Sequence, residues 1–597
     1  MFKHWLYRII VILSSLTFSS FNVHAIELTQ IPNSGTPPET PPPQDVIPPR
    51  PSPSPVPQIP PKPKPPPSLE TPEQFSPPLP AEILERCPST ITVEDFNFRG
   101  NTVFTQEELT QVTEEFKQEP LSCAELLQAA LAVTKFYIEK GYRTSGAITV
   151  LPKDIKPDQE VVVTIKVIEG KLEEEPEVIA LGDGRLNNYV RSRLGVELEE
   201  PLNVNQLQEA LQLLQLDPLI ESIAAKLARG SDTGKSILEV QYSEAPTFNP
   251  QVSLNNGRSP SVGSFERGVV LRQANLLGLG DAISLGYTNS DGSDRLDLSY
   301  ELPLNSSNGT LRFTYLQSEN DVIEPPFNDL DIESESRYYE LSLRQPIIRS
   351  IKGRTFQELA LGLTGFWRES ESFLFDEPFR FSLGADDNGS TRIFALRFFQ
   401  DWTRQNPREV IALRSEFSLG LDAFNSTVNE QISGVEEIAD SRFFAWRGQA
   451  QWLRLLAENS LLLVRVNAQL AEALLPSEQF AIGGLGSVRG YRQDQIITDN
   501  GLFASAEVRL PILRIFEGEG MLQLIPFVDY GIGWNSSDRT NPDPNNLASV
   551  GIGLQWQQGN NFNARLDWGI PLVDVDLRDR TWQENGILFT VQWNPSF

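Results

Sequence analysis

The sequence predicts a membrane β-barrel of about 16 antiparallel strands, preceded by two small α/β domains. After Pro246, short segments in which apolar and polar residues alternate continue to the end of the 597-residue chain. Before them, one order of strands and helices occurs twice in tandem. We therefore divide the chain into a leader (residues 1–25), a proline-rich linker (26–82), two α/β domains (83–170 and 171–246) and a barrel (247–597).

The composition excludes several classes of function. The chain has 79 acidic against 50 basic residues, a net charge of −29, so it lacks the basic surface that nucleic acid requires. Its two histidines, His4 and His24, both lie in the leader, which leaves none for a catalytic triad or a zinc cluster in the mature chain. We expect no enzyme, no metal and no cofactor. A hydrolase that uses two carboxylates remains open, although no such site stands out.

The first 25 residues have the order of a secretory signal. Lys3 and Arg8 precede an apolar run at residues 9–13, and small and polar residues then lead to Ala25. This order predicts cleavage after Ala25. An uncleaved anchor is the alternative, although the apolar run is shorter than the roughly 20 residues of a spanning helix. No later segment is apolar over about 18 residues, so we expect no helical span in the mature chain.

The linker, residues 26–82, is rich in proline and includes Pro41-Pro42-Pro43. Proline has no N–H donor and a fixed φ, so we expect residues 31–80 neither to pair in a sheet nor to join a helix. The segment should form an extended, semi-rigid spacer. A role as a tether or as a peptide bound by a partner remains open.

The first α/β domain begins with an alternating strand at residues 91–98. Residues 105–108 and 122–125 are two capping boxes, in which a hydroxyl and a carboxylate satisfy free N–H groups at a helix start. They predict a short helix and a longer one. Strands at residues 147–151 and 161–168 complete a β-α-α-β-β order.

The second α/β domain repeats this order. Its elements are a strand at 178–181, a helix at 186–194 ended by Gly195, a helix capped by Asn203 and reaching Leu216, and strands at 220–227 and 236–242. Both domains leave sheet edges open, and neither has enough residues for a catalytic cleft of its own.

Cys87 and Cys123 are the only cysteines, and both belong to the first α/β domain. In an oxidising compartment we expect one disulfide between them, because paired cysteines persist there. A bridge that closes a loop of this length contributes roughly 3–4 kcal/mol when its geometry is unstrained. Two free buried thiols are the alternative.

The barrel region alternates with period two. Ile283, Leu285 and Tyr287 alternate with Ser284, Gly286 and Thr288, and the second face throughout the region includes many acids and arginines. A soluble sandwich would rarely place charges opposite every apolar position, whereas a barrel places apolar residues toward lipid and polar residues toward a lumen. The chain ends at Phe597, a terminal aromatic that fits both an aromatic girdle and a signal for barrel insertion.

A glycine-rich segment beginning at Gly483 ends in the tetrapeptide Val488-Arg489-Gly490-Tyr491. It lacks the lysine and hydroxyl of a phosphate-binding P-loop, and no helix follows it. With the leader, the tandem domains and the barrel length, the tetrapeptide resembles the two-partner secretion (type Vb) transporters, the haemolysin and filamentous-haemagglutinin exporters of the POTRA-barrel superfamily. Two further family-like marks are the segments 275–281 and 507–511.

The resemblance implies that the α/β domains are periplasmic POTRA domains and that the tetrapeptide tips the sixth extracellular loop. In the family, its arginine meets an aspartate of a Phe-x-Asp motif on the barrel wall. The matching residues are Arg489, Phe527 and Asp529. Strand parity agrees, because Val528 and Tyr530 facing lipid would turn Phe527 and Asp529 inward. Unrelated solvated charges are the alternative.

The resemblance further implies an outer-membrane translocase that exports a partner exoprotein. The unfolded exoprotein would add a strand to a POTRA sheet edge and pass through the lumen. Membrane lipid and, through the strand ending at Phe597, the barrel-assembly machinery would be the other partners. An outer-membrane assembly factor of the same superfamily and a passive porin are the alternatives. The exported partner, a plug helix, the oligomeric state and the role of the proline-rich segment stay open.

Overall fold

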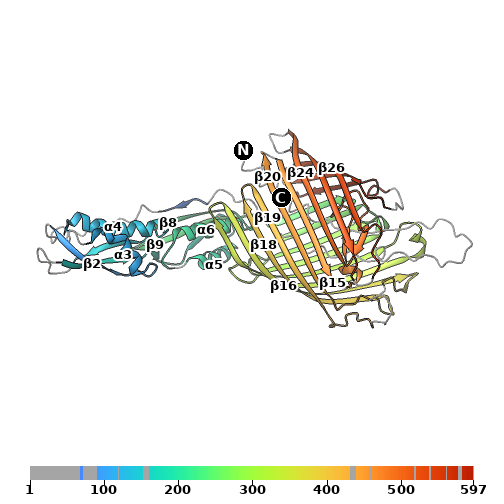
Figure 1. The fold of residues 1–597 in the computed structure, drawn as a ribbon, viewed down its shortest axis with the longest axis horizontal. Helices are drawn as coiled ribbons and strands as arrows, with labels where there is room; N and C mark the ends of the chain where they lie inside the picture. The colour runs from blue at the N-terminus through green and yellow to red at the C-terminus, as the bar shows by residue number, and fades with distance from the viewer. Residues whose placement is uncertain are drawn as a thin grey trace, which may run out of the picture. The chain divides into compact units, whose positions relative to one another are not determined.

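The computed structural model describes residues 67–71, 90–117, 120–151, 160–198, 200–382, 384–430, 438–457, 460–515, 520–536, 539–559, 561–575 and 581–595. The predicted leader, Cys87 and Phe597 lie outside these residues. The chain divides into two compact units, Pro63–Ala245 and a second unit that contains Pro246–Phe597. The first unit is coloured blue to green in Figure 1, and the second green to red.

The first half of the α/β unit is a four-stranded sheet in the order β3-β2-β5-β4. Its elements are β2 (Ile91–Arg99), α3 (Gln106–Thr113), η2 (Glu114–Phe116), β3 (Pro120–Leu121), α4 (Cys123–Glu139), β4 (Gly146–Val150) and β5 (Glu160–Ile168). Both helices begin at the predicted capping boxes, with Thr105 and Ser122 as N-cap residues. Val93, Val133 and Val163 are fully buried in the shared core of the helices and the sheet.

Glu169 ties the loop after β2 to the end of β5. Its carboxylate accepts hydrogen bonds from the backbone N–H groups of Thr102 at 2.7 Å and Val103 at 3.1 Å, and from the Tyr137 hydroxyl at 2.8 Å. Burial acts to raise the pKa of Glu169, but these donors outweigh it and hold the pKa below its usual value. The ionised carboxylate therefore stabilises the end of the sheet near neutral pH.

The second half of the α/β unit repeats the fold with a central antiparallel pair, β8 and β9. Its elements are β6 (Lys171–Leu172), β7 (Glu177–Ala180), α5 (Asn187–Glu197), α6 (Val204–Gln215), β8 (Ile220–Arg229) and β9 (Lys235–Glu244). The predicted stop at Gly195 is wrong, because α5 continues two residues beyond it. Gly195 lies in open space, and an exposed glycine inside a helix costs only about 1 kcal/mol relative to alanine.

The expectation that the proline-rich linker cannot pair in a sheet is also wrong at one point. Strand β1 (Leu69–Glu70) pairs in parallel with β8, opposite Ala225 and Lys226. The Ala225 N–H donates to the Ser68 carbonyl at 3.0 Å. Residues 68–71 contain no proline, so this short stretch keeps its N–H donors and can form an edge strand.

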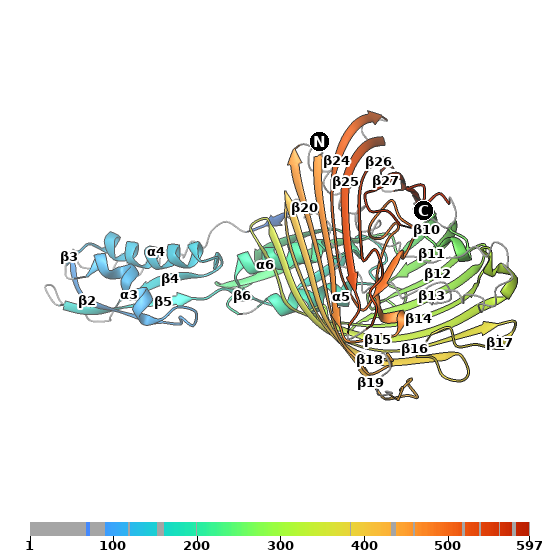
Figure 2. The same cartoon turned by 45° about the vertical axis from the view of Figure 1, so that its right-hand side comes forward.

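The second unit is a closed antiparallel barrel, which confirms the predicted fold class (Figures 1 and 2). Neighbours follow chain order, and β28 closes the sheet by pairing with β10. One member of the closed order, β17 (Glu377–Pro378), has only two residues. The other sixteen strands are β10 (Phe248–Asn255), β11 (Glu266–Ala274), β12 (Ala282–Ser290), β13 (Ser293–Pro303), β14 (Thr310–Asp321), β15 (Ile332–Lys352), β16 (Thr355–Leu374), β18 (Ser390–Asn406), β19 (Glu409–Leu421), β20 (Phe444–Ala457), β21 (Ser460–Ala471), β24 (Asn500–Ile515), β25 (Gly520–Trp534), β26 (Asn546–Gln558), β27 (Phe562–Pro571) and β28 (Ile587–Trp593).

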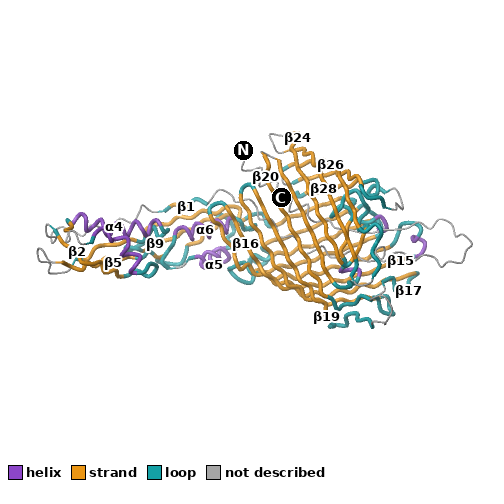
Figure 3. The backbone as a smooth tube through the Cα atoms, viewed as in Figure 1, coloured by secondary structure: helices purple, strands orange, loops and turns teal. Residues whose placement is uncertain are grey.

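The two faces of the barrel wall differ as the alternation predicts. Leu470 on β21 is 51% exposed on the outer face, whereas the preceding Gln469 is 3% exposed on the inner face. Figure 3 shows that strands make up nearly all of the wall and that loops gather at its rims. None of the helices in the described ranges is long and apolar enough to cross a membrane.

Because neighbouring strands of the barrel run in opposite directions, their connections lie alternately at two rims. Strand β10 starts at the rim that follows Ala245, here called the near rim, and each antiparallel pairing reverses the direction. The turns after β11, β18 and β20 therefore lie at the near rim, and the connection between β21 and β24 is the sixth at the far rim. The near-rim turn after β11 is tightly built, since Asn275 adopts φ 50° and the Asp281 carboxylate accepts the Leu277 N–H at 2.9 Å.

Candidate functional site

The candidate site is where the sixth far-rim connection, residues 472–499, meets the inner wall of the barrel. This connection, called the sixth loop below, contains η5 (Pro476–Glu478) and a small hairpin of β22 (Phe480–Ile482) and β23 (Ile496–Thr498). The predicted tetrapeptide lies between the two hairpin strands. Val488, Arg489, Gly490 and Tyr491 are all buried.

Arg489 and Asp529 form a bidentate ion pair. Arg489 Nε lies 2.7 Å from Asp529 Oδ2, and Arg489 Nη2 lies 2.8 Å from Asp529 Oδ1. The Arg489 backbone N–H also donates to Asp529 Oδ2 at 3.1 Å. Both residues are 1% exposed, so the pair is shielded from water and from screening ions. A planar guanidinium matches a carboxylate in this geometry, which a lysine ammonium cannot reproduce.

The pair belongs to a larger charged cluster on β24, β25 and β27. Arg489 Nη1 also lies 3.0 Å from the Glu507 carboxylate and 3.7 Å from Asp567. Glu507 is shared, because Arg509 and Arg565 approach it at 2.6 and 2.9 Å. The positive charges of the arginines and the negative charges of the carboxylates thus neutralise one another in this buried cluster, as buried charges require.

The ring of Phe527 packs against the flat face of the Arg489 guanidinium. The Arg489 Cζ lies 3.5 Å from the centre of the Phe527 ring, a stacked cation–π geometry. The two ends of the Phe-x-Asp motif therefore contact the same arginine, one through its face and one through its edge. Residues 527 and 529 of one strand can do this because alternate side chains share a face.

Two glycines allow the tip of the sixth loop to touch the wall. Gly490 adopts φ +100°, a conformation that favours glycine. A Cβ added at Gly569 on β27 would lie 2.6 Å from the Gly490 nitrogen and 2.7 Å from the Arg489 carbonyl carbon. The two backbones are thus in direct contact, with no room for a side chain on the β27 side.

Tyr491 and Val488 anchor the tip on either side of Arg489. The Tyr491 hydroxyl oxygen lies 2.7 Å from the Ala548 carbonyl and 3.1 Å from the Val573 carbonyl, so its one proton is donated to the nearer carbonyl or shared between the two. Val488 is fully buried and packs with Tyr491 in an apolar cluster of the loop and the wall. Every residue of the tetrapeptide therefore has a defined contact with the barrel.

Two residues of the sixth loop outside the tetrapeptide, Glu478 and Arg492, form four further ion pairs. Glu478 lies 2.8 Å from Arg397 on β18 and 2.7 Å from Arg447 on β20. Arg492 lies 2.6 Å from Glu324 in the third far-rim connection and 3.4 Å from Glu584 in the last one. Glu478 thus fixes the loop to two wall strands, and Arg492 fixes it to two other far-rim connections.

The family described as "Haemolysin secretion/activation protein ShlB/FhaC/HecB" matches residues 234–556, more than half of the chain. The chain belongs to this family. A second match, "POTRA domain, ShlB-type", covers residues 91–170, the first half of the α/β unit. These matches confirm the family that the tetrapeptide and the domain order resemble.

Individual relatives agree over most of the chain. The Heme/hemopexin transporter protein HuxB of Haemophilus influenzae is 22% identical over 494 residues, 79% of this chain and 82% of the relative. The Outer membrane transporter CdiB of Dickeya dadantii is 23% identical over 447 residues, 71% of this chain and 74% of the relative. The solved structure of CdiB from Escherichia coli has a TM-score of 0.64 at 21% identity and covers 86% of this chain and 95% of its own.

As a member of this family, the chain is an outer-membrane transporter of two-partner secretion that exports a partner exoprotein, and it is not an enzyme. Its POTRA domains lie in the periplasm. The near rim of the barrel is therefore periplasmic, and the sixth loop emerges from the extracellular rim. The predictions of fold, function and location are confirmed.

Sequence reasoning named Phe527 and Asp529 as partners of Arg489 but did not predict the contacts with Glu507 and Asp567. Glu507 was noted only as the start of the family-like segment 507–511. Asp567 was recognisable as an inward position, since it lies between the outward apolar residues Leu566 and Trp568. Alternation gives the face of a residue and not its height in the lumen, which is set by the pairing register of successive strands.

The remaining predicted site, the disulfide between Cys87 and Cys123, lies outside the described residues, because Cys87 and the Cys123 side chain are not part of them. A group of carboxylates that the sequence did not suggest lies at the extracellular rim, where Asp331, Glu333 and Asp376 come within 4.8 Å of one another. Two of the three are exposed to water, which suffices to solvate their charges.

Proposed function

We propose that the transporter captures its unfolded exoprotein by strand addition to a POTRA sheet edge and passes it through the barrel lumen. We further propose that the ion pair of Arg489 and Asp529 holds the sixth loop in its export-competent position. The observation that carries the capture step is the pairing of β1 with β8. An extended segment of the chain itself already uses this edge, and main-chain hydrogen bonds of this kind impose no strict sequence code.

Within the described residues, β1 pairs with only a small part of β8. Strand β8 spans Ile220–Arg229, and β1 covers only Ala225 and Lys226. A two-residue strand contributes few hydrogen bonds, so a longer exoprotein strand would compete with it favourably. The edge of β4 in the first POTRA domain offers a second site of the same type.

The inner wall suits the passage of an unfolded chain. On β18 and β19, Asp401, Arg414 and Glu416 face the lumen and form ion pairs with one another, with Arg414 lying 3.3 Å from each carboxylate. Charges that are mutually paired present little apolar surface to which an unfolded chain would adhere. Recognition of the C-terminal strand by the barrel-assembly machinery, through Phe597, belongs to the same proposal.

An edge-blocking substitution tests the capture step. Ala225→Pro removes the N–H that points away from β9, while edge strands tolerate proline. We expect exoprotein secretion, and crosslinking of the exoprotein to the POTRA unit, to fall at least about tenfold. Ala225→Ser keeps the N–H and should behave as wild type. Wild-type secretion by Ala225→Pro, in a barrel that remains heat-modifiable, would exclude capture at this edge.

A further inference from the structure

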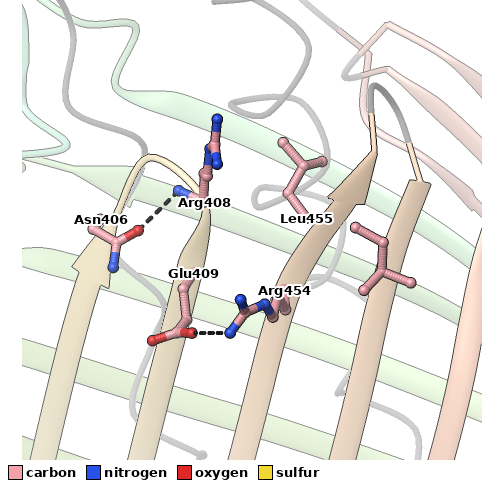
Figure 4. Close-up of a pocket in the computed structure, with 6 residues that line it drawn as sticks. Asn406, Arg408, Glu409, Arg454 and Leu455 are labelled. Atoms are coloured by element: carbon pink, nitrogen blue, oxygen red, sulfur yellow. Dashed lines mark hydrogen bonds and ion pairs between the residues drawn. The ribbon is translucent and has the colours of Figure 1, made fainter.

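A basic pocket lies on the outer face of the barrel at the periplasmic rim. It has a volume of about 460 Å³ and lies between the turn after β18 and the end of β20 (Figure 4). Its lining residues are Asn406, Arg408, Glu409, Arg454, Leu455 and Leu456. None of them takes part in the sixth-loop site.

Two hydrogen bonds of the Arg408 backbone hold one side of the pocket in place. The Arg408 N–H donates to Asn406 Oδ1 at 2.9 Å, and the Arg408 carbonyl accepts the Leu455 N–H at 2.8 Å. The second hydrogen bond extends the pairing of β19 with β20 by one residue, because Glu409 and Arg454 are the last paired positions of these strands. The backbone positions of Arg408 and Arg454 are therefore set by main-chain contacts, whereas the exposed Arg408 side chain extends away from Arg454 (Figure 4).

The charge in the pocket is positive within a strongly acidic chain. Arg454 is half exposed and lies 3.2 Å from Glu409, the single carboxylate in the lining. The exposed guanidiniums of Arg404 and Arg408 form no ion pair with any residue in the described ranges. The lining therefore holds two arginines and one carboxylate, with Arg404 on the neighbouring outer face of β18, although the whole chain has a net charge of −29.

The outer face fixes the depth of the pocket in the membrane. On β18, Leu396 and Phe398 are exposed toward lipid, and the next outward positions toward the periplasm are Gln400, Trp402, Arg404 and Asn406. On β20, Trp452 precedes Arg454 on the same face, with the guanidinium 6.0 Å from its ring. Tryptophans mark the edge of the hydrocarbon region, so the arginines lie at the level of the lipid headgroups.

We propose that this pocket binds the phosphate of an anionic phospholipid of the periplasmic leaflet. Arg408 and Arg454 bind the phosphodiester, Arg404 adds to the positive field, and the exposed Leu456 contacts the first part of an acyl chain. Arginine is suited to this role because its guanidinium forms two parallel hydrogen bonds to phosphate oxygens. The bound lipid anchors the two periplasmic turns at the leaflet.

Native mass spectrometry of the full-length protein in detergent tests the proposal, with short-chain phosphatidylglycerol as the probe and phosphatidylcholine of the same chain length for comparison. The wild type should retain phosphatidylglycerol preferentially. Arg408→Gln/Arg454→Gln should lower its binding by about twenty-five-fold, because each basic residue near a membrane surface contributes about fivefold. Glu409→Gln removes the opposing charge and should raise binding a few-fold.

Arg337→Gln is the matched control, since Arg337 is an outward arginine near the other rim that pairs with Glu335 at 3.2 Å. It should bind phosphatidylglycerol as the wild type does. Equal binding by the double variant and this control would overturn the proposal, and so would equal retention of the two lipids by the wild type. Complete displacement of the lipid by millimolar inorganic phosphate would instead assign the pocket to free phosphate.

Discussion

At the scale of single residues, Arg489 is the centre of a cluster and not half of an isolated pair. Asp529, Glu507 and Asp567 all lie within 3.7 Å of its guanidinium. An isolated pair would tolerate exchange of its two charges. Here an aspartate at position 489 would face two remaining carboxylates, so an exchange should not restore the contact.

Substitutions at Arg489 should therefore have graded effects. Arg489→Ala leaves a buried carboxylate without its partner, which costs about 3–5 kcal/mol, and secretion should be nearly lost. Arg489→Lys keeps the charge but not the bidentate geometry and should lose much of the activity. Secretion of the exoprotein, measured beside the heat-modifiability of the barrel, checks both expectations.

Double variants distinguish the contribution of the Arg489–Asp529 pair to secretion from that of the surrounding charged cluster. In a double-mutant cycle, Arg489→Ala and Asp529→Ala should be strongly non-additive, because they remove two partners of one contact. Arg489→Asp/Asp529→Arg should stay defective. Recovery in that exchanged variant would show that Glu507 and Asp567 contribute little to the contact.

At the scale of elements, the sequence predicted best where a local rule decides the structure. The helices α3 and α4 begin at capping boxes that are complete within four residues of sequence. The pairing of β1 with β8 could not be predicted, because it joins residues far apart in the chain through two backbone positions. The contacts of the sixth loop depend in the same way on the register of distant strands.

The close contact of the sixth loop with β27 gives a prediction at this scale. Gly569→Ala places a methyl group against the backbone of Arg489 and Gly490 and leaves all the charges in place. Overpacking of this kind costs about 1–3 kcal/mol, so the docked state of the loop should lose roughly tenfold or more in population. We expect reduced secretion together with greater cleavage of the loop by an externally added protease.

Gly365→Ala on β16 is the matched control, because its added Cβ would meet only the Leu396 side chain at 3.5 Å. It should secrete at the wild-type level. Unchanged secretion and protection in Gly569→Ala would mean that the loop tip does not need its contact with β27.

At the scale of the whole molecule, alternation and domain order were sufficient for the architecture. The dyad pattern predicted both the barrel and its two faces, because lipid and lumen impose opposite polarity on alternate residues. The contact between the tetrapeptide and the wall could not be predicted from alternation and domain order, since the residues that meet there are far apart in the chain. Only the family resemblance connected Arg489 to Asp529, and the structure adds the carboxylates around them.

The central claim is that Arg489 acts by holding the sixth loop against the wall. Val488 and Gly531 allow a direct test, because a Cβ added at Gly531 would lie 3.0 Å from Val488 Cγ2, which places the side chains of cysteines at these two positions next to each other. The measurement is exoprotein secretion by Arg489→Ala with Val488→Cys and Gly531→Cys added, before and after reduction. The account predicts that the oxidised tether restores secretion and that reduction removes it. A fully formed disulfide that leaves secretion as defective as in Arg489→Ala alone would contradict the account.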